Sequence, residues 1–408
     1  MSVTLSRAEA RRLLVSHLGL NRVLGRGARG TRAVLERLRC IQLDPLDVIG
    51  TNADLVVMAR VDDVCRGDVW QHLFPKHAFE HFAKERCILP AESFPRYRQQ
   101  GHLAETPWWR HGERERRIAP EVLRAVLDEV RARGPLTAPE LTDHGRVEPM
   151  NWSGWKSTAK ATSMALEILW TRCDVVVAGR TESGAKLYDV PERNLAKFPK
   201  PAGDFPRWAV RERAHAAGLL SRAGGAMWSM LAKVRTSPLI DELIEAGDLV
   251  EIAVEDSPRR YLAVPEFLAK RRVTYDDRIR ILGPLDPLIW DRELVRHLFD
   301  FEYVWEVYKP AKQRRWGWYV CPLLQRDRFI GRVEARVDNG VLVVKKLWME
   351  PDVIMGREDG EGSPADGGGS FAALRMTLER HASLCGATKV RMPRGFRAAS
   401  AGAARPSA

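Results

Sequence analysis

The stretch KSTAKATSMALEILWTRCDVVVAGRTESGAKLYDV, from Lys156 to Val190, contains the pattern that decides the fold. Alanine, isoleucine and leucine recur at helical spacing in its first half and predict a helix over residues 156–172. Three valines at 175–177 and the segment 186–190 then predict two strands, separated by a turn at Glu182-Ser183-Gly184. A helix that leads into a two-stranded hairpin is the second half of a winged helix.

The residues just before this stretch supply the first half of the same unit. Apolar residues at helical spacing predict a helix over residues 122–130 that ends at Gly134. Thr137 and Glu140 form a capping box, which predicts the start of a second helix. Three helices followed by a hairpin are the order of a winged helix, which we predict for residues 118–200.

The same order recurs, less cleanly, in the next segment of the chain. Helices are predicted over residues 211–220 and 225–234, and Ser237-Pro238 begins a third that ends at Gly247. Two apolar segments on either side of Ser257-Pro258 predict a second hairpin. We therefore predict a third winged helix at residues 201–275, after a first, winged-helix-like unit at residues 1–117.

The C-terminal part of the chain is rich in predicted strands. A helix at residues 292–299 precedes alternating segments at 316–321, 328–337 and 341–345, the last two joined by the hairpin turn Asn339-Gly340. Residues 356–370 read as a flexible loop and residues 371–384 as a closing helix. We predict a β-rich domain at 276–392 and a disordered tail at 393–408, and hence an α+β protein.

Charge and composition favour a nucleic acid as the partner. The 65 lysines and arginines outnumber the 53 acidic residues in a chain of 408, for a net charge of +12. No apolar run is long enough to span a membrane, and residues 1–6 do not form a secretory signal. The six cysteines have neither zinc nor iron–sulfur spacing. We expect a cytoplasmic, nucleoid-associated protein without metal or cofactor.

Basic residues on the predicted recognition helices and wings are the candidates for DNA contact. For any one of them the alternative is a solvated charged face, whereas the whole set favours DNA. The predicted DNA-binding residues are Lys156, Lys160, Arg172, Arg180, Lys186, Lys233, Arg235, Arg314 and Arg315.

A short polar motif, Cys40-Ile41-Gln42-Leu43-Asp44-Pro45, is the candidate for chemistry. Proline pushes the residue before it into extended geometry, and on an extended segment Gln42 and Asp44 share one side. A neighbouring amide and carboxylate can hold and orient a water molecule. The alternative is that Asp44-Pro45 opens a turn and that Gln42 is merely solvated.

Several longer motifs give the chain a family resemblance. Together with Gln42-Leu43-Asp44, segments 282–292, 299–303, 306–310, 315–319 and 331–333 resemble the AlkZ-like bacterial DNA glycosylases. The resemblance covers residues 5–350, and the Gln-x-Asp triplet resembles the YcaQ-like branch that repairs crosslinks. It implies three tandem winged helices in a C-shaped clamp around a basic channel, acting as a monomer on double-stranded DNA.

The resemblance also implies a reaction and its residues. Family members excise N-alkylated purines, and the Gln-x-Asp branch unhooks interstrand crosslinks joined through guanine N7; the catalytic positions fall on Gln42 and Asp44. Two departures lie near the expected site. Residues 50–54 (Gly-Thr-Asn-Ala-Asp) replace a stretch that usually bears Arg and His, and Lys84 replaces a frequent His on a helix expected at 79–86. The substrate-proximal residues are thus Asn52, Asp54 and Lys84.

The chemistry of the lesion agrees with these residue types. An N7-alkylated guanine is already cationic, so it leaves without a general acid. Asp44 would stabilise the cationic sugar and activate water, while Gln42 orients water or sugar. No lysine is a candidate to form a Schiff base, so the prediction is a monofunctional hydrolase without lyase activity. A crosslinked guanine cannot flip freely out of the duplex, which favours an open channel over a tight pocket. The rival function is a non-enzymatic winged-helix regulator.

Overall fold

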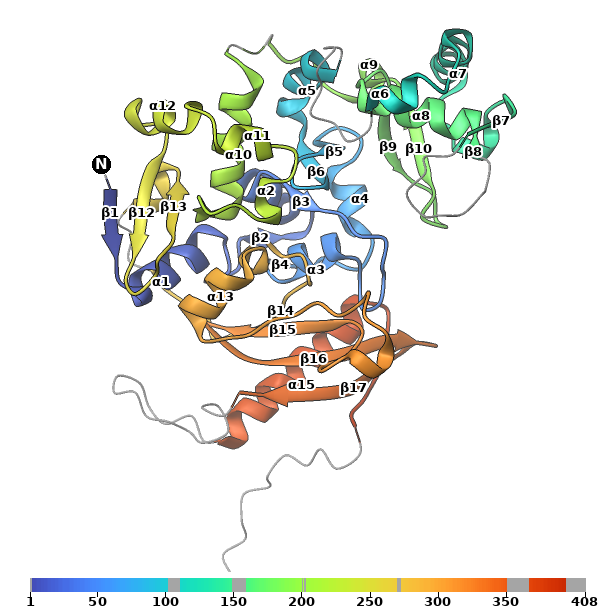
Figure 1. The fold of residues 1–408 in the computed structure, drawn as a ribbon. Coiled ribbons are helices and arrows are strands. Elements are labelled where there is room, and N and C mark those ends of the chain that lie inside the picture. The colour runs from blue at the N-terminus through green and yellow to red at the C-terminus, as the bar shows by residue number, and fades with distance from the viewer. Residues whose placement is uncertain are drawn as a thin grey trace, which may run out of the picture.

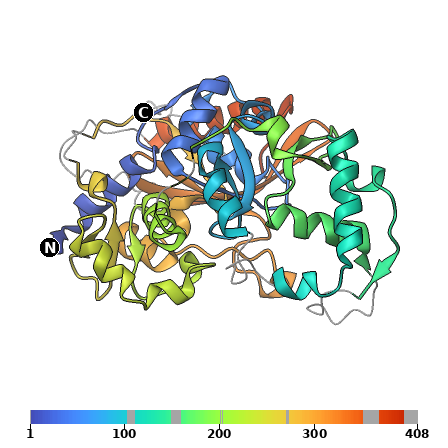
Figure 2. The same ribbon diagram turned by 90° about the horizontal axis from the view of Figure 1, so that it is seen from above.

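The computed structural model describes residues 2–101, 111–148, 159–199, 201, 203–269, 273–350 and 367–393. Helices and small sheets alternate up to about residue 269, and a five-stranded sheet dominates the remainder (Figure 1). In both ribbon views, elements of residues 111–194 stand on one side, those of residues 205–268 on the other together with the N-terminal helix, and those of residues 25–101 between them (Figures 1 and 2). Among the described helices, none combines the length and the apolar character needed to cross a bilayer.

The first part of the chain is a set of helices around a small antiparallel sheet of order β3-β6-β5. The capping box predicted at Ser6 and Glu9 is confirmed, because each side chain binds the other residue's backbone N–H. The elements are α1 (Arg7–His17), β2 (Gly25–Arg26), α2 (Gly27–Leu38), β3 (Ile41–Gln42), α3 (Asn52–Met58), β4 (Val61–Asp62), α4 (Asp68–Leu73), β5 (Ala78–Phe82), β6 (Arg86–Pro90), η1 (Ala91–Ser93) and α5 (Phe94–Gly101).

The helix predicted over residues 79–86 is wrong: this segment is the β5–β6 hairpin, with Phe79 paired to Leu89 and Phe82 to Arg86. All five residues of β5 are buried, so polar residues of the strand face protein rather than water. Trp170, for example, donates its indole N–H to the backbone carbonyl of Glu80. A strand enclosed on both faces loses the alternating pattern that distinguishes it from a helix. The consequence is that Lys84 lies at the tip of a hairpin.

The next part has the element order that the sequence predicted for residues 118–200. A 3₁₀ turn takes the place of the second helix, and its predicted capping box between Thr137 and Glu140 is present. β9 and β10 pair antiparallel, as predicted. The elements are α6 (His111–Glu115), α7 (Pro120–Arg133), η2 (Ala138–Glu140), β7 (Arg146–Val147), β8 (Ala159–Lys160), α8 (Ala161–Thr171), β9 (Val176–Arg180), β10 (Lys186–Asp189) and α9 (Pro191–Asn194).

The third part contains the second predicted hairpin, with Val250 opposite Ala263. The helix predicted over residues 225–234 is reduced to one 3₁₀ turn and one short helix. The N-terminal strand β1 (Ser2–Leu5) was not predicted; it pairs parallel with β12 and completes the sheet β1-β12-β13-β11. The other elements are α10 (Phe205–Ala217), β11 (Leu220–Ser221), η3 (Ala226–Trp228), α11 (Ala232–Arg235), α12 (Leu239–Glu245), β12 (Val250–Val254), β13 (Arg260–Ala263) and η4 (Pro265–Leu268).

The last part is the five-stranded sheet β14-β15-β16-β17-β18, against which α15 packs through Leu374 and Leu378. The predicted turn at Asn339-Gly340 is confirmed, with φ of 47° and 71°. Of the predicted loop over 356–370, residues 367–370 belong to α15, and the rest lies outside the described residues, as does the tail beyond 393. The elements are β14 (Ile279–Ile281), η5 (Pro287–Ile289), α13 (Arg292–Phe299), η6 (Ala311–Gln313), β15 (Val320–Gln325), β16 (Arg328–Asp338), β17 (Val341–Met349), α15 (Gly367–Leu384) and β18 (Lys389–Arg391).

A buried ion pair joins the first part of the chain to the last. The Arg60 guanidinium donates to both carboxylate oxygens of Asp286, at 2.7 and 3.0 Å, and both side chains are completely enclosed. Arg60 also donates to the backbone carbonyls of Leu18 and Val56. Loss of one partner from such a pair costs about 3–5 kcal/mol, so the two parts hold a fixed relation. The segment with Gln42 and Asp44 belongs to the first of these two parts.

Candidate active site

Gln42 is the last residue of β3, where it pairs with Cys87 of β6. The N–H of Leu43 donates to the carbonyl of Arg86 at 2.8 Å and continues the pairing past the end of the strand. Ile41 is fully buried, as expected for the residue that faces the core. The backbone is therefore extended at Ile41 and Gln42, and the pairing with β6 reaches Leu43.

Asp44 is half-buried, and only one of its carboxylate oxygens has a hydrogen bond among the described residues. Its Oδ1 accepts the N–H of Leu46 at 2.9 Å, which closes the turn that an Asp-Pro pair favours. Burial raises the pKa of Asp44, and the hydrogen bond from Leu46 opposes part of that rise. The second oxygen remains available to a water molecule or a ligand.

Lys84 lies directly against Gln42. Its Nζ donates to Gln42 Oε1 at 2.9 Å and lies 5.1 Å from the centre of the Trp290 ring. Lys84 is only 6% exposed, and none of the described carboxylates forms an ion pair with it. Burial lowers its pKa from 10.5 to about 8.

The contact with Lys84 determines which way the Gln42 amide faces. An ammonium group has only donors, so it must meet the amide oxygen of Gln42 and not its nitrogen. The amide NH₂ of Gln42 is then directed away from Lys84 and presents donors to the site. Lys84, which the sequence analysis predicted to lie near the substrate, is brought to Gln42 by the pairing of β3 with β6.

The tip of the β5–β6 hairpin is held in place by the third part of the chain. Ser229 donates its hydroxyl to Glu85 Oε1 at 2.5 Å, and Arg213 donates to the carbonyl of Ser229 at 3.1 Å. The backbone of Glu85 has a φ of 96°, a conformation that costs a residue other than glycine about 1–3 kcal/mol. Lys84 is thus fixed by contacts from two separate parts of the molecule.

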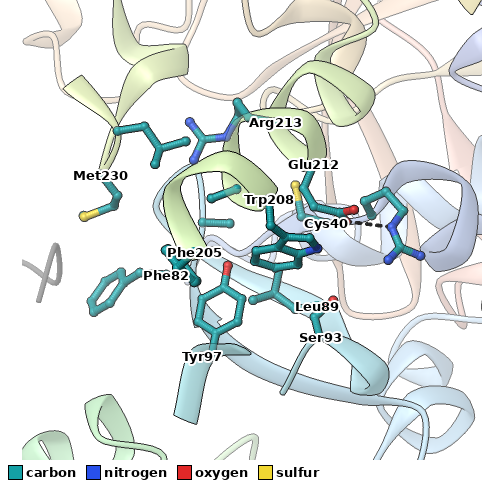
Figure 3. Close-up of a pocket in the computed structure, with 14 residues that line it drawn as sticks. Cys40, Phe82, Leu89, Ser93, Tyr97, Phe205, Trp208, Glu212, Arg213 and Met230 are labelled. Carbon is teal, nitrogen blue, oxygen red and sulfur yellow. Dashed lines mark hydrogen bonds and ion pairs between the residues drawn. The ribbon is translucent and has the colours of Figure 1, made fainter. Parts of the chain in front are cut away.

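A small, mostly apolar pocket lies at this junction (Figure 3). Its walls come from the β5–β6 hairpin and from α10, with Tyr97 and Trp208 facing each other and Arg213 close to Cys40. Its lining includes Ala83, the neighbour of Lys84, but neither Gln42 nor Asp44. The pocket therefore adjoins the segment with Gln42 and Asp44 through Cys40 without including either residue.

Asn52 was predicted to lie near the substrate, and the structure places it inside the protein. Its side chain is 0% exposed; its Nδ2 donates to the Gln42 carbonyl at 2.8 Å, and its Oδ1 accepts the Leu285 N–H at 3.1 Å. A Cβ at Gly283 would lie 2.5 Å from Asn52 Oδ1, so only glycine leaves room for this contact. Asn52 therefore positions Gln42 against the segment 282–292.

Asp54, the other predicted neighbour of the substrate, is also buried. It accepts the N–H of Thr51 at 3.0 Å and completes the capping box of α3. Its second oxygen accepts the N–H of Gly67 at 3.0 Å. These bonds fix the loop that follows the catalytic motif.

Tyr319 was not recognised individually as a site residue. Its side chain is 1% exposed, and its hydroxyl has no hydrogen-bond partner among the described residues. Burial raises its pKa, with smaller contributions from Cys321 and from the negative charge of Asp44. Tyr319 is therefore a neutral donor in the neighbourhood of Asp44. Tyr319 and Trp290 lie in motifs of the family resemblance, and those motifs were the signal for both.

The predicted DNA-binding residues fall into two groups. Lys160 and Lys233 are exposed, and each is without an ion pair within the described ranges. Arg315 is exposed and pairs with Glu302 at 2.8 Å, while Arg314 and Arg235 donate to backbone carbonyls. Lys156 lies outside the described residues.

The other group binds carboxylates within the protein. Arg172 donates to Glu115 at 2.8 Å. Arg180 pairs with the buried Glu80, and Lys186 lies 3.8 Å from the same carboxylate. The contacts of Arg180 and Lys186 with Glu80 tie the hairpin β9–β10 to β5, so they hold the second part of the chain against the first.

Comparisons with known proteins agree with this arrangement. The family model described as "DNA glycosylase AlkZ-like" matches residues 35–384. The solved structure of the Streptomyces sahachiroi DNA glycosylase AlkZ is similar, with a TM-score of 0.56 and 17% sequence identity, over 96% of this chain and 100% of that one. At that identity the likeness concerns the fold, whereas the family model covers most of the sequence. The chain belongs to the AlkZ-like family of DNA glycosylases.

Proposed function

We propose that this protein hydrolyses the N-glycosidic bond of N7-alkylated guanine in double-stranded DNA, in base excision repair. The observation that carries the proposal is the state of Asp44: a half-buried carboxylate, two residues from Gln42, with one oxygen free of hydrogen bonds from the described residues. The substrate includes guanine in interstrand crosslinks, whose tether to the other strand requires an open site. Asp44 is half-buried, so part of its side chain remains open to solvent, in keeping with that requirement.

The reaction needs a group that stabilises the cationic sugar and activates water, and we assign both tasks to Asp44. The alkylated base carries a positive charge and leaves as a neutral molecule, so the barrier lies in the cationic sugar and in the positioning of water. A carboxylate stabilises the developing sugar cation and accepts a proton from the attacking water. Because burial raises the pKa of Asp44, excision is lost at a higher pH on acidification than it would be with an exposed aspartate.

Gln42 serves as a hydrogen-bond donor. Its Oε1 is occupied by Lys84, so its NH₂ is the group that meets the water or a sugar oxygen. The backbone of Gln42 is held by Asn52. Lys84 and Asn52 are thus positioning residues for the hydrolysis.

Three winged helices in a C-shaped clamp are the arrangement we propose for DNA binding. The element orders of residues 120–194 and 205–268 support it, as do the exposed Lys160, Lys233 and Arg315. Binding would rest mainly on phosphates, by a monomer in the cytoplasm, and would weaken steeply with salt.

The test is excision by the variant Asp44→Asn. Loss of the base should lower the rate of 7-methylguanine release by roughly 10²–10⁴-fold. Asp47→Asn is the matched control, because Asp47 lies three residues away and pairs with Arg66 at 2.7 Å on the surface. Alkali-labile abasic sites are counted on duplexes that carry 7-methylguanine or a nitrogen-mustard crosslink.

Each other outcome has a definite meaning. An Asp44→Asn variant as fast as the wild type would remove Asp44 from the mechanism. Absence of release by the wild type, with DNA binding intact, would favour the non-enzymatic winged-helix regulator. Release from the methylated duplex alone would exclude the crosslink as a substrate.

A further inference from the structure

The amine of Lys84 is placed and ionised differently from an ordinary lysine. Its one hydrogen bond among the described residues goes to the Gln42 amide, and it forms no ion pair there. Both residues are largely buried, with 6% of Lys84 and 7% of Gln42 exposed, and their side chains are in direct contact at 2.9 Å. A ligand that reaches the amide of Gln42 is therefore within reach of the Lys84 amine.

The surroundings of Lys84 favour its neutral form. Burial lowers its pKa to about 8, and Arg213 lowers it further, while Cys87, Glu85 and Cys40 oppose the change. At pH 7.5 a pKa of 8 leaves about a quarter of the amine neutral, against roughly 0.1% for a pKa of 10.5. Desolvation and a nearby cation are the two means by which proteins activate a lysine as a nucleophile.

We propose that Lys84 gives this protein a second activity, cleavage of the DNA strand at the abasic site that excision leaves behind. The inference rests on the proposed function for its substrate, since hydrolysis of the glycosidic bond leaves a deoxyribose whose C1′ opens to an aldehyde. The amine of Lys84 lies 2.9 Å from the amide of Gln42, the residue that the proposed hydrolysis places beside the sugar.

The step balances without any further reactant. The neutral amine attacks C1′, and loss of one water gives a protonated imine. A carboxylate, for which Asp44 is placed, takes a proton from C2′; the C3′–O bond then breaks, and the phosphate leaves with the electron pair. Water hydrolyses the imine, which restores Lys84 and leaves an unsaturated aldehyde on one fragment and a 5′-phosphate on the other.

A purely orienting role for Lys84 is the alternative. In that case the ammonium only holds Gln42 Oε1, and the strand stays intact after excision. An arginine could also donate to Gln42, whereas it cannot form the imine. The two roles therefore differ in whether a covalent bond to DNA exists.

The experiment uses the full-length protein and a duplex with a pre-formed abasic site, so that no excision is needed. Sodium borohydride reduces an imine to a stable amine. The expected result is a covalent protein–DNA adduct, mapped by mass spectrometry to the peptide that contains Lys84, and strand cleavage when borohydride is omitted. Lys84→Arg should lose both the adduct and the cleavage.

The proposal is overturned if the wild type forms no adduct, or if the adduct maps to another lysine such as Lys160 or Lys186. Mapping on the wild type keeps the test valid even if the Lys84→Arg variant does not fold. A parallel reaction on 7-methylguanine duplex separates the two activities. Release of base without cleavage of abasic DNA contradicts the second activity alone, and cleavage without release contradicts the hydrolysis alone.

Discussion

Two lysines, Lys84 and Lys186, are held in similar ways against different acceptors. Each ammonium lies over an indole, Lys84 at 5.1 Å from Trp290 and Lys186 at 5.8 Å from Trp170. Burial lowers the pKa of both. Lys186, however, forms an ion pair with the Glu80 carboxylate at 3.8 Å, whereas Lys84 meets only an uncharged amide.

The two lysines therefore differ in whether an opposite charge compensates the buried ammonium group. A carboxylate compensates the buried charge of Lys186, and the pair joins β10 to β5. Nothing of opposite charge among the described residues pairs with Lys84, so its burial costs stability. A residue that costs stability at a fixed position is expected to have another use, and the proposed use of Lys84 is at Gln42.

The largest change in stability should follow from removal of the Glu80 carboxylate, with which both Arg180 and Lys186 form ion pairs. Glu80→Ala leaves Arg180 and Lys186 without their shared acceptor. We expect the free energy of unfolding to fall by about 3–5 kcal/mol, measured by urea denaturation. Glu92→Ala is the control, because Glu92 is an exposed partner of Arg39 and should cost about 0–1 kcal/mol. Equal losses in the two variants would contradict the structural role.

Replacement of Lys84 and of Lys186 should change the free energy of unfolding in opposite directions. At pH 7 Lys84→Met should raise the free energy of unfolding by about 1–2 kcal/mol, since it removes an uncompensated charge and loses one hydrogen bond. Lys186→Met should lower it by about 1 kcal/mol, because Glu80 loses a partner. If the free energy of unfolding changed in the same direction in both variants, the two lysines would not differ in their contribution to stability.

The pH dependence of this difference follows from the pKa of Lys84. Its pKa is about 8 in the folded protein and 10.5 as an ordinary lysine, so the unfolded chain binds more protons between these values. The stability of the wild type relative to Lys84→Met should therefore rise from pH 8 to pH 10.5, by up to about 3 kcal/mol. Denaturation of both proteins across that range measures it, and a constant difference would contradict the lowered pKa.

The smallest effect is expected at Tyr319. Its hydroxyl is buried without a partner among the described residues, so Tyr319→Phe should leave stability within about 0.5 kcal/mol of the wild type. If the hydroxyl supports the ionised Asp44, excision should still slow by about threefold to tenfold. Single-turnover rates on the methylated duplex provide the measurement, and an unchanged rate would limit Tyr319 to packing.

Local patterns predicted much of this fold. Helix α13 has the predicted bounds Arg292–Phe299, because Asp291 caps it and its apolar residues recur at helical spacing. The turn at Asn339-Gly340 follows from residues that tolerate positive φ. The turn that an Asp-Pro pair favours is present at Asp44, whose Oδ1 accepts the N–H of Leu46.

Features that depend on distant pairing could not be predicted in this way. Strand β1 pairs with β12, far along the chain, and its own four residues contain no signal of that partner. All five residues of strand β5 are buried, including the polar ones. The strand therefore lacks the alternation of buried and exposed residues that would distinguish it from a helix. The same distant pairing brings Lys84 and Asn52 to Gln42, and for this reason their roles at the site emerged only from the structure.

The bond from Leu285 to Asn52 also has a consequence during synthesis. The residue that anchors the Gln42 backbone is itself anchored 233 positions later in the chain. A nascent chain on the ribosome that has not yet exposed Leu285 lacks this support, and it also lacks Asp286, the partner of Arg60. The backbone of Gln42 therefore receives its full set of contacts only once the chain has been made as far as Leu285.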